Sequence, residues 1–444
     1  MQEGSLGAPE RHVIPWRDDE FYDELSLDKE LRRVFDICHG CRRCFNLCDS
    51  FPKLFDLIDD SDSGELDTVS STNFEEVIDS CTLCDLCFMT KCPYVPPHEF
   101  NLDFPHLMLR ARAAKAKNNG IPFVQKELTK TDRNGLIGGW LAPISNWIGK
   151  CGNNITRPAM ELILGVHRDA ILPKFSFSTF KSKAKEKLEI NRSAPAFGRK
   201  VVIFSTCFSN YNNPEIGLAA RRVLAKNGVE SEVVYPKCCG MPQFEHGDIA
   251  AVAESALTVS ASLRPWIEKK YSVIALIPSC ALMMKFEWPL IVPESDDVLL
   301  LSKSTQDITE YIVDIAKTEG VADGLGSVEG GVTMHVACHA RAQNMGQKGV
   351  EMLRIIPDID INVIERCSGH GGSWGIMKGN FETAMKIGRP AYRKISELKQ
   401  SYIVSECPLA REHLVQGAKS LAVNYDKVSS FQHPIQVLAS AYGL

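Results

Sequence analysis

The sequence predicts an α/β protein in which two related α/β domains follow a mainly α-helical N-terminal domain. Three observations lead to this prediction. Eight of the sixteen cysteines in the 444-residue chain are crowded into two short groups near the N-terminus. From about residue 200 onward, β-branched apolar segments alternate with helix-like segments, which is typical of parallel sheets. One cysteine-bearing pattern also occurs twice in that half, which indicates an internal duplication.

The composition excludes several classes of protein. With 44% hydrophobic and 24% charged residues, the chain is an ordinary globular protein. Its net charge of −5, without a basic arm, gives no reason to expect a nucleic-acid partner. Neither a secretory signal nor a run of about 20 apolar residues is visible, so we expect a cytoplasmic protein. Peripheral attachment to the cytoplasmic face of the inner membrane is the alternative. Thiols stay reduced in that compartment, so the cysteines favour metal or redox chemistry.

The two N-terminal groups, "CHGCRRCFNLC" and "CTLCDLCFMTKCP", each space three cysteines at three-residue intervals and add a fourth nearby. Bacterial two-cluster ferredoxins share this spacing, and in them the fourth cysteine of one group ligates the other cluster. We therefore predict one [4Fe–4S] cluster on Cys38, Cys41, Cys44 and Cys92, and a second on Cys81, Cys84, Cys87 and Cys48. Zinc is the alternative, but zinc sites usually pair C-x2-C motifs across a long loop. Asp49 replaces the usual proline and the second group has one extra spacer residue, yet no ligand is lost.

The segments around these groups predict helices. "FPKLFDLID", "TNFEEVIDS" and residues 104–118 have helical periodicity, so we expect a helical two-cluster ferredoxin domain over residues 1–118. Residues 119–197 predict a helical connector with two strongly apolar stretches, "GGWLAPISNWIG" and "AMELILGVHRDAILPKF". These stretches either pack on the rest of the protein, which is the commoner case, or contact lipid or a partner subunit. The isolated Cys151 is expected to be a small buried residue.

In the C-terminal half, six strand-like segments each run into cysteine. The first three are "KVVIFSTC", "SEVVYPKCCG" and "SVIALIPSC", and the second three are "VTMHVAC", "INVIERCSG" and "SYIVSEC". We predict two α/β domains, over residues 198–325 and 326–444. Ligands of open α/β sheets gather at the carboxyl ends of the strands. The cysteines should therefore converge there, as one set of Cys207, Cys238, Cys239 and Cys280 and another of Cys338, Cys367 and Cys407. Gly240 would allow a tight turn beside the first set.

The stretches "PKCCGMP", "IPSCALMMKFEWP" and "ACHARAQNMG" resemble the cysteine-rich CCG-domain family, which includes subunits of heterodisulfide reductase and of anaerobic glycerol-3-phosphate dehydrogenase. The resemblance implies an iron–sulfur cluster on Cys207, Cys238, Cys239 and Cys280. The family pattern has five cysteines per domain, and here Met283, Ser368 and Ala410 replace three of them. Three thiols in the second domain would need help from solvent, from substrate, or from His339, His370 or His413. These losses put heterodisulfide chemistry in doubt.

The sequence contains no dinucleotide fingerprint, Walker loop or Ser–His–Asp elbow, and "SGHGGSWG" belongs to the Cys367 loop. No FAD is therefore expected on this chain, and a flavoprotein or other redox subunit is the expected partner. The leading hypothesis is an iron–sulfur electron-transfer subunit that relays electrons between such a donor and a quinone-type acceptor. The alternatives are a heterodisulfide or thiol reductase acting at the CCG site, and a non-catalytic redox sensor or scaffold. No catalytic residue is assigned.

Overall fold

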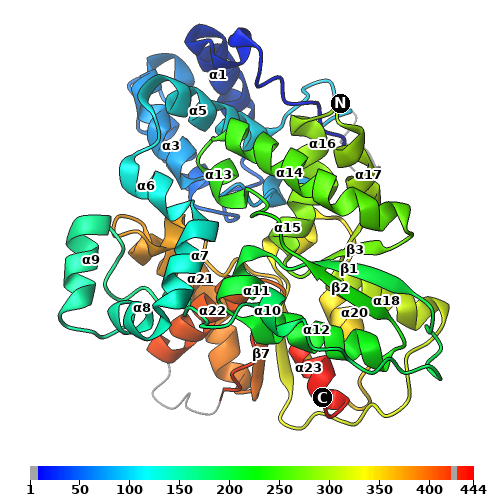
Figure 1. Cartoon of the computed structure of the whole chain (residues 1–444). Coiled ribbons are helices and arrows are strands. Elements are labelled where there is room, and N and C mark those ends of the chain that lie inside the picture. The colour runs from blue at the N-terminus through cyan, green and yellow to red at the C-terminus, as the bar shows by residue number, and fades with distance from the viewer. Residues whose placement is uncertain (1–8, 422–427) are drawn as a thin grey trace. The chain divides into compact units, whose positions relative to one another are not determined.

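The computed structural model describes residues 9–421 and 428–444 (Figure 1). The chain forms two compact units, one of residues up to Thr129 with Gly240–Ala253, and one of Lys130–Cys239 with Glu254–Leu444. The first residues of the expected ferredoxin domain, and residues 422–427 of the expected second CCG domain, lie outside the described residues. The four domain boundaries expected from the sequence stay predictions.

The first unit is helical throughout its described residues. Its α-helices are α1 (Glu24–Cys41), α2 (Ser50–Asp59), α3 (Phe74–Ser80), α4 (Leu86–Thr90), α5 (Phe104–Asn119), α6 (Phe123–Leu128), α13 (Met241–Glu245) and the start of α14 (Ile249–Glu268). Short 3-10 turns lie at Asp19–Tyr22, Leu66–Thr68 and Ser71–Asn73. The prediction of a mainly helical N-terminal region is therefore confirmed.

Aromatic packing holds these helices together. The rings of Phe35 and Phe74 meet edge to face with centroids 5.1 Å apart, which joins α1 to α3. The rings of Phe51 and Phe104 are 4.7 Å apart, which joins α2 to α5. Such pairs add about 1 kcal/mol each beyond the apolar area they bury. The helices that frame both cysteine groups are thus fixed to one core.

The second unit contains two parallel sheets. The first sheet has the strand order β2-β1-β3-β4 and the second the order β6-β5-β7, and every strand pair is parallel. The strands are β1 (Lys200–Phe204), β2 (Glu230–Val234), β3 (Ser272–Ala275), β4 (Thr305–Asp307), β5 (Val332–His335), β6 (Ile361–Ile364) and β7 (Tyr402–Ser405). In both sheets the first of three strands lies between the second and the third. This shared order confirms the α/β fold and agrees with an internal duplication.

Helices connect and cover these strands (Figure 1). Around the first sheet they are α11 (Cys207–Tyr211), α12 (Pro214–Lys226), α14, α15 (Pro278–Leu282), α16 (Trp288–Ile291), α17 (Asp296–Ser304) and α18 (Ile308–Thr318), with a π-helical turn at Met283–Glu287. Around the second they are α19 (Cys338–Ala342), α20 (Lys348–Leu353), α21 (Phe381–Leu398), α22 (Pro408–Leu421) and α23 (Pro434–Ala441), with a 3-10 turn at Trp374–Ile376. Because all paired strands are parallel, each crossover returns the chain to the same edge of its sheet, and the carboxyl ends of the strands lie together.

Two details of the second unit could not be read from local pattern. Residues 341–356 carry an almost continuous helix-like sequence, but the structure divides it between α19 and α20. Asn344 and Gly346 have φ values of +51° and +78°, in the left-handed region that a helix cannot accommodate. The fourth strand of the first sheet, β4, was not expected, because three residues without an apolar run carry little strand signal.

The connector belongs to the second unit from Lys130 onward and forms α7 (Thr131–Trp140), α8 (Ala142–Ile148), α9 (Thr156–Leu164) and α10 (Phe180–Lys183). Helices α7 to α9 are cyan in Figure 1. Packing covers only part of them, because Trp140 is 75% exposed and Leu162 is 85% exposed. Cys151 is exposed, so the expectation that it is buried is wrong. It lies in the turn between α8 and α9, which leaves its side chain outside the core. No described helix is long and apolar enough to cross a membrane.

Candidate iron–sulfur centres

The eight N-terminal cysteines lie where helices end or begin. Cys38 and Cys41 occupy the last turn of α1, and Cys44 and Cys48 lie in the loop that leads to α2. The second group starts at the C-terminal end of α3, passes through the loop before α4, and ends just after α4. The loop around the second group is strained, since Leu83 and Asp85 have φ values of +47° and +62°. Such strain is frequent at functional sites.

The first set brings residues from both cysteine groups together. Burial raises the pKa of Cys38, and the neighbouring thiols of Cys92, Cys44 and Cys41 raise it further. Burial together with Cys92 and Cys41 raises the pKa of Cys44 to about 12, while Lys91 lowers it. Cys92, which comes from the second group, thus lies among three thiols of the first. Four crowded thiols repel one another as thiolates unless a cationic centre lies between them.

The second set has the reverse composition. Burial raises the pKa of Cys48, and the thiols of Cys84 and Cys81 raise it further. Burial also raises the pKa of Cys87, as do Cys84, Cys81 and Cys48. Cys48 of the first group therefore lies among three cysteines of the second.

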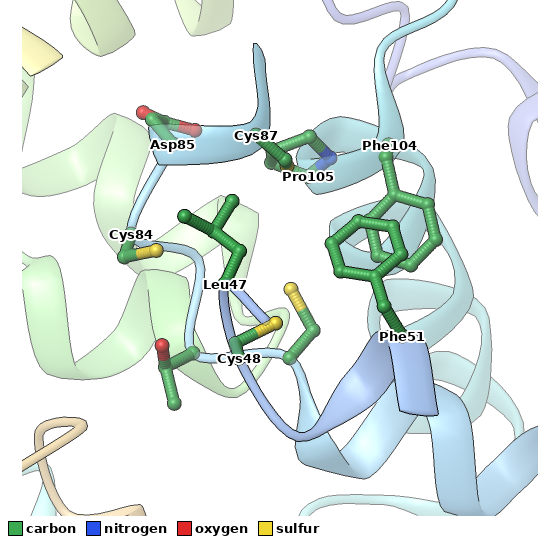
Figure 2. Close-up of a pocket in the computed structure, with 10 residues that line it drawn as sticks. Leu47, Cys48, Phe51, Cys84, Asp85, Cys87, Phe104 and Pro105 are labelled. Atoms are coloured by element: carbon green, nitrogen blue, oxygen red, sulfur yellow. The ribbon is translucent and has the colours of Figure 1, made fainter. Parts of the chain in front are cut away.

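A small pocket lies between the members of this second set. It is lined by Leu47, Cys48, Phe51, Cys81, Thr82, Cys84, Asp85, Cys87, Phe104 and Pro105. Figure 2 shows Cys48, Cys84 and Cys87 on separate segments around this space, with the rings of Phe51 and Phe104 closing one side. A thiol-lined, largely apolar space suits a sulfide cluster, whose potential depends on burial.

Backbone amides are directed at several of these sulfurs. The N–H groups of Ser50 and Phe51, in the first turn of α2, donate to the Cys48 thiol and lower its pKa against the larger effect of burial. The N–H groups of Tyr94 and Val95 do the same for Cys92. Such hydrogen bonds to cluster sulfurs tune reduction potentials. The donor set and these amides fit a cluster at both N-terminal sites.

Arginines fix the loops that carry the second set. Arg11 donates to both oxygens of Asp85, at 2.7 and 3.1 Å, and to both oxygens of Asp103, at 2.9 and 3.3 Å. Arg112 donates to the carbonyl oxygens of Ile78, at 2.7 Å, and of Cys81. Buried planar guanidinium groups of this kind give directional contacts that a lysine cannot reproduce. Arg11 is remote in sequence from both cysteine groups, and nothing in its local pattern pointed to this role.

The cysteines of the first sheet also meet, as the sheet topology predicts. Cys207 begins α11 after β1, Cys238 and Cys239 follow β2, and Cys280 lies in α15 after β3. The sulfurs of Cys207 and Cys238 are 3.9 Å apart, and those of Cys239 and Cys280 are 3.1 Å apart. The turn that follows Cys239 requires the φ of +85° that Gly240 adopts.

Three residues that sequence reasoning missed surround this set. The Asp132 carboxylate, from α7, accepts the Cys238 amide at 3.0 Å and the Tyr235 hydroxyl. The indole N–H of the fully buried Trp288 donates to the carbonyl oxygen of Cys239 at 3.2 Å. Tyr235 could have been suspected from its place in "VVYPKCCG". Asp132 gives no such signal, because it is more than one hundred residues away from Cys238 in sequence.

The cysteines of the second sheet occupy equivalent places. Cys338 begins α19 after β5, Cys367 follows β6, and Cys407 follows β7. Cys367 is exposed and accepts the Gly369 amide at 3.4 Å, whereas Cys238 and Cys239 are buried. Helices α15 and α19 are in contact, and Gln343 donates to the Pro278 carbonyl oxygen at 3.3 Å. Cys280 and Cys338 therefore lie on neighbouring helices.

Histidines near the second set are neutral at physiological pH. Burial lowers the pKa of His370 to about 3 and that of His413 to about 4. Their ring centroids are 6.0 Å apart. The Nε2 atom of each is buried and has no hydrogen-bond partner within the described part of the chain. Two buried imidazoles with an unused nitrogen have the chemistry of nitrogen ligands.

The family model for the cysteine-rich CCG domain matches residues 201–285 and 332–411. These matches cover β1 to β3 of the first sheet and the three strands of the second, and they include all seven C-terminal cysteines described above. The chain therefore contains two regions that match the CCG domain.

Subunits of oxidoreductases are among the relatives of this chain. An anaerobic glycerol-3-phosphate dehydrogenase subunit of Escherichia coli is 26% identical over 71% of this chain and 76% of the relative. A fumarate reductase (CoM/CoB) subunit of Methanothermobacter marburgensis is 25% identical over 55% of this chain and 47% of the relative. Lactate utilization protein A of Bacillus pumilus is 29% identical over 40% of this chain and 75% of the relative. The likeness supports iron–sulfur clusters and electron transport.

Met283, Ser368 and Ala410, which stand where the resemblance calls for cysteine, are all buried. Met283 is completely buried in the π-helical turn after α15. The Ser368 carbonyl oxygen accepts the Tyr392 hydroxyl at 2.9 Å, and Ala410 lies in α22. The first CCG domain keeps four convergent thiols, which is enough for a [4Fe–4S] cluster. The second keeps three, together with the two unpartnered imidazole nitrogens.

Proposed function

We propose that this chain is the iron–sulfur electron-transfer subunit of an oxidoreductase, which relays electrons between a flavoprotein or other donor and a quinone-type acceptor. The observation that carries the proposal is the crossed arrangement of the N-terminal thiols, in which Cys92 joins the first group and Cys48 joins the second. Two-cluster ferredoxins have this arrangement because each cluster borrows one ligand from the other motif.

We propose three ligand sets. Two [4Fe–4S] clusters are proposed, one on Cys38, Cys41, Cys44 and Cys92, and one on Cys81, Cys84, Cys87 and Cys48. A third cluster is proposed on Cys207, Cys238, Cys239 and Cys280. Bound clusters would supply one-electron transfer. The protein contributes burial, amide donors to the sulfurs and fixed loops, which together set the potentials.

The second CCG domain is proposed as the exit side of the relay. Of its set of Cys338, Cys367 and Cys407, Cys338 lies on α19, which contacts the helix α15 that carries Cys280, and Cys367 is exposed. An incomplete set with an exposed thiol is a suitable place for contact with an external acceptor. We assign no cluster type there.

We also propose that the protein docks on an anionic membrane surface through the exposed apolar side chains of α7 to α9. These are Leu136, Ile137, Trp140, Ile144, Trp147, Ile148, Ile155, Leu162 and Ile163. Trp140 and Trp147 are 75% and 54% exposed, and indole rings favour the interface between lipid and water.

The charges of this region favour lipid over a second protein. Arg133, Lys150 and Lys174 are exposed in the same segment, against the exposed acid Asp169. The Asp132 carboxylate accepts the Tyr235 hydroxyl, and the Glu161 carboxylate accepts a hydrogen bond from Arg168, so both acids are engaged within the protein. Apolar side chains beside exposed cations are typical of peripheral helices on anionic lipid. A quinone-type acceptor is itself resident in the membrane, which agrees with this location.

Metal analysis of the anaerobically purified protein tests the cluster proposal. With four irons per site, we expect about twelve irons and an equal amount of acid-labile sulfide per chain, or about sixteen if the second CCG domain is also filled. About eight irons would limit clusters to the N-terminal sets, and a colourless, zinc-loaded protein would overturn the proposal. Reduction of a quinone analogue supports the assigned acceptor. Turnover of a dithiol–disulfide couple instead would favour a thiol reductase.

A further inference from the structure

The Asp132 carboxylate lies at the first CCG domain although it belongs to the connector. Its Oδ2 atom accepts the backbone N–H of Cys238 at 3.0 Å, and its Oδ1 atom accepts the hydroxyl of Tyr235. Burial raises the pKa of Tyr235, and the thiols of Cys207 and Cys238 raise it further, so the phenol lies close to both thiols. The carboxylate, the phenol and the C-C-G loop therefore form one connected group.

Helix α7 is built to bring this carboxylate to the thiols. Asp132, Gly135 and Gly139 share one face at the i, i+3 and i+7 positions of the helix. A Cβ atom on Gly135 would lie 2.4 Å from the ring of Tyr211, so a side chain at this position would push the helix away from α11. Ile137 lies on the opposite side of the helix and Trp140 on its flank, and both side chains are exposed. The helix thus approaches the cysteine set on one side and is exposed on the other.

Both contacts of the carboxylate are with donors. The backbone N–H of Cys238 can only donate, and the Tyr235 hydroxyl donates to the second oxygen, so both contacts suit the ionised, acceptor-only form of Asp132. Burial raises the pKa of this half-buried carboxylate, whereas the hydrogen bonds from Tyr235 and the Cys238 amide, together with the charge of Lys237, lower it. An acidic residue that only stabilised the N-terminus of α7 could equally well lie on the exposed side of the helix. The position of Asp132 beside Cys238 and Tyr235 therefore indicates a further role.

We propose that Asp132 is a positioning residue of the first CCG domain, which anchors the C-C-G loop through the Cys238 amide and whose negative charge lowers the reduction potential of a cluster held there. The inference rests on the proposed function, since it presupposes a cluster on Cys207, Cys238, Cys239 and Cys280. A fixed negative charge disfavours the added electron, and second-sphere groups tune clusters in this way. Tyr235 orients the carboxylate through its hydroxyl.

Three variants separate position from charge. Asp132→Asn keeps the shape, because its oxygen can accept the Cys238 amide while its NH2 group donates to the Tyr235 oxygen, but it removes the charge. Asp132→Ala removes both contacts. Tyr235→Phe removes the hydroxyl and keeps the charge. Asp169→Asn, which neutralises an exposed acid of the same connector, is the matched control.

The measurements are iron content and an EPR-monitored redox titration of the full-length protein at constant pH. The signal of this site is the one that disappears in Cys238→Ser. In Asp132→Asn we expect wild-type iron content. We also expect the equilibrium constant for reduction to rise at least tenfold, which raises the reduction potential of a one-electron couple by at least about 59 mV. Tyr235→Phe should shift the potential less than Asp132→Asn. Asp132→Ala should lose about four irons, one cluster's worth. Asp169→Asn should change neither quantity.

Amide hydrogen exchange of the C-C-G loop in the metal-free chain provides a readout that needs no cluster. We expect exchange at least tenfold faster in Asp132→Ala than in the wild type. Two results would overturn the role of Asp132 and leave the proposed function intact. One is a wild type that carries the CCG cluster and an Asp132→Asn variant with the same reduction potential. The other is an Asp132→Ala variant whose amide exchange equals that of the wild type. A wild type with iron only at the N-terminal sets would overturn the proposed CCG cluster, and the redox part of this inference with it.

Discussion

The sulfur atoms of Cys239 and Cys280 lie 3.1 Å apart although 41 positions separate the two residues in sequence. Cys239 follows β2 and Cys280 follows β3, and these strands flank β1 in the same parallel sheet. Their carboxyl ends therefore meet at one edge. Cys280→Ser should remove about four irons per chain and leave the N-terminal clusters in place. Iron analysis and EPR check this, with the exposed Cys151→Ser as the control. Loss of all iron would show that the sites do not load independently.

The crossed N-terminal sets predict that Cys48 and Cys92 each serve the cluster of the other motif. Cys48→Ser should alter the EPR signal that depends on Cys81, and Cys92→Ser the signal that depends on Cys41. Both comparisons use the anaerobic, reduced protein. If each serine variant altered instead the signal of its own motif, the ligand sets would be uncrossed.

The ion pairs of Arg11 are expected to stabilise the first unit. Its side chain is 10% exposed and that of Asp85 is 5% exposed, so the loss of the guanidinium would strand a buried carboxylate. Arg11→Gln should lower the free energy of unfolding by about 3 kcal/mol in urea titrations. Arg33→Gln, which breaks the exposed pair with Glu30, should change it by less than about 1 kcal/mol. Equal effects of the two variants would contradict a structural role for Arg11.

Acid should weaken the second unit through His433. Burial lowers the pKa of this completely buried histidine to about 3, and its Nδ1 atom accepts the Ile435 amide at the start of α23. The unfolded chain takes up the proton near pH 6.5 and the folded chain does not, so stability falls as the pH drops from about 6.5 towards about 3. At about pH 5 the loss should be about 2 kcal/mol relative to neutral pH.

The variant His433→Asn keeps a capping oxygen and cannot titrate in this range. Urea unfolding of the metal-free protein at both pH values should therefore show a smaller acid loss in this variant. An undiminished loss would assign the effect to other groups.

Binding to vesicles tests the membrane-docking proposal. The double variant Trp140→Ser and Leu162→Ser should bind vesicles that contain anionic lipid at least tenfold more weakly than the wild type, because two exposed apolar anchors are lost. Wild-type binding should weaken at high salt and with purely zwitterionic vesicles. Leu257→Ser, at an exposed position on α14, is the control and should bind normally. Sedimentation of the protein with the vesicles measures each case. Equal binding to both lipid compositions would contradict the assigned role of the cations.

The sequence alone determined the fold class, the helical N-terminal region, the internal duplication and the cysteines that meet at the edge of the first sheet. The spacing of the cysteines and the alternation of strand-like with helix-like segments carry that information. Both patterns are set by residues close together in sequence, and parallel strands place their carboxyl ends at one edge of the sheet. The tertiary structure alone decided that α7 brings Asp132 to Cys238, that Arg11 binds Asp85 and Asp103, and that the helices of the connector leave Trp140 and Leu162 exposed. Those relationships depend on how distant segments pack. A charged or apolar residue in a helical stretch carries no local mark of the partner it will meet.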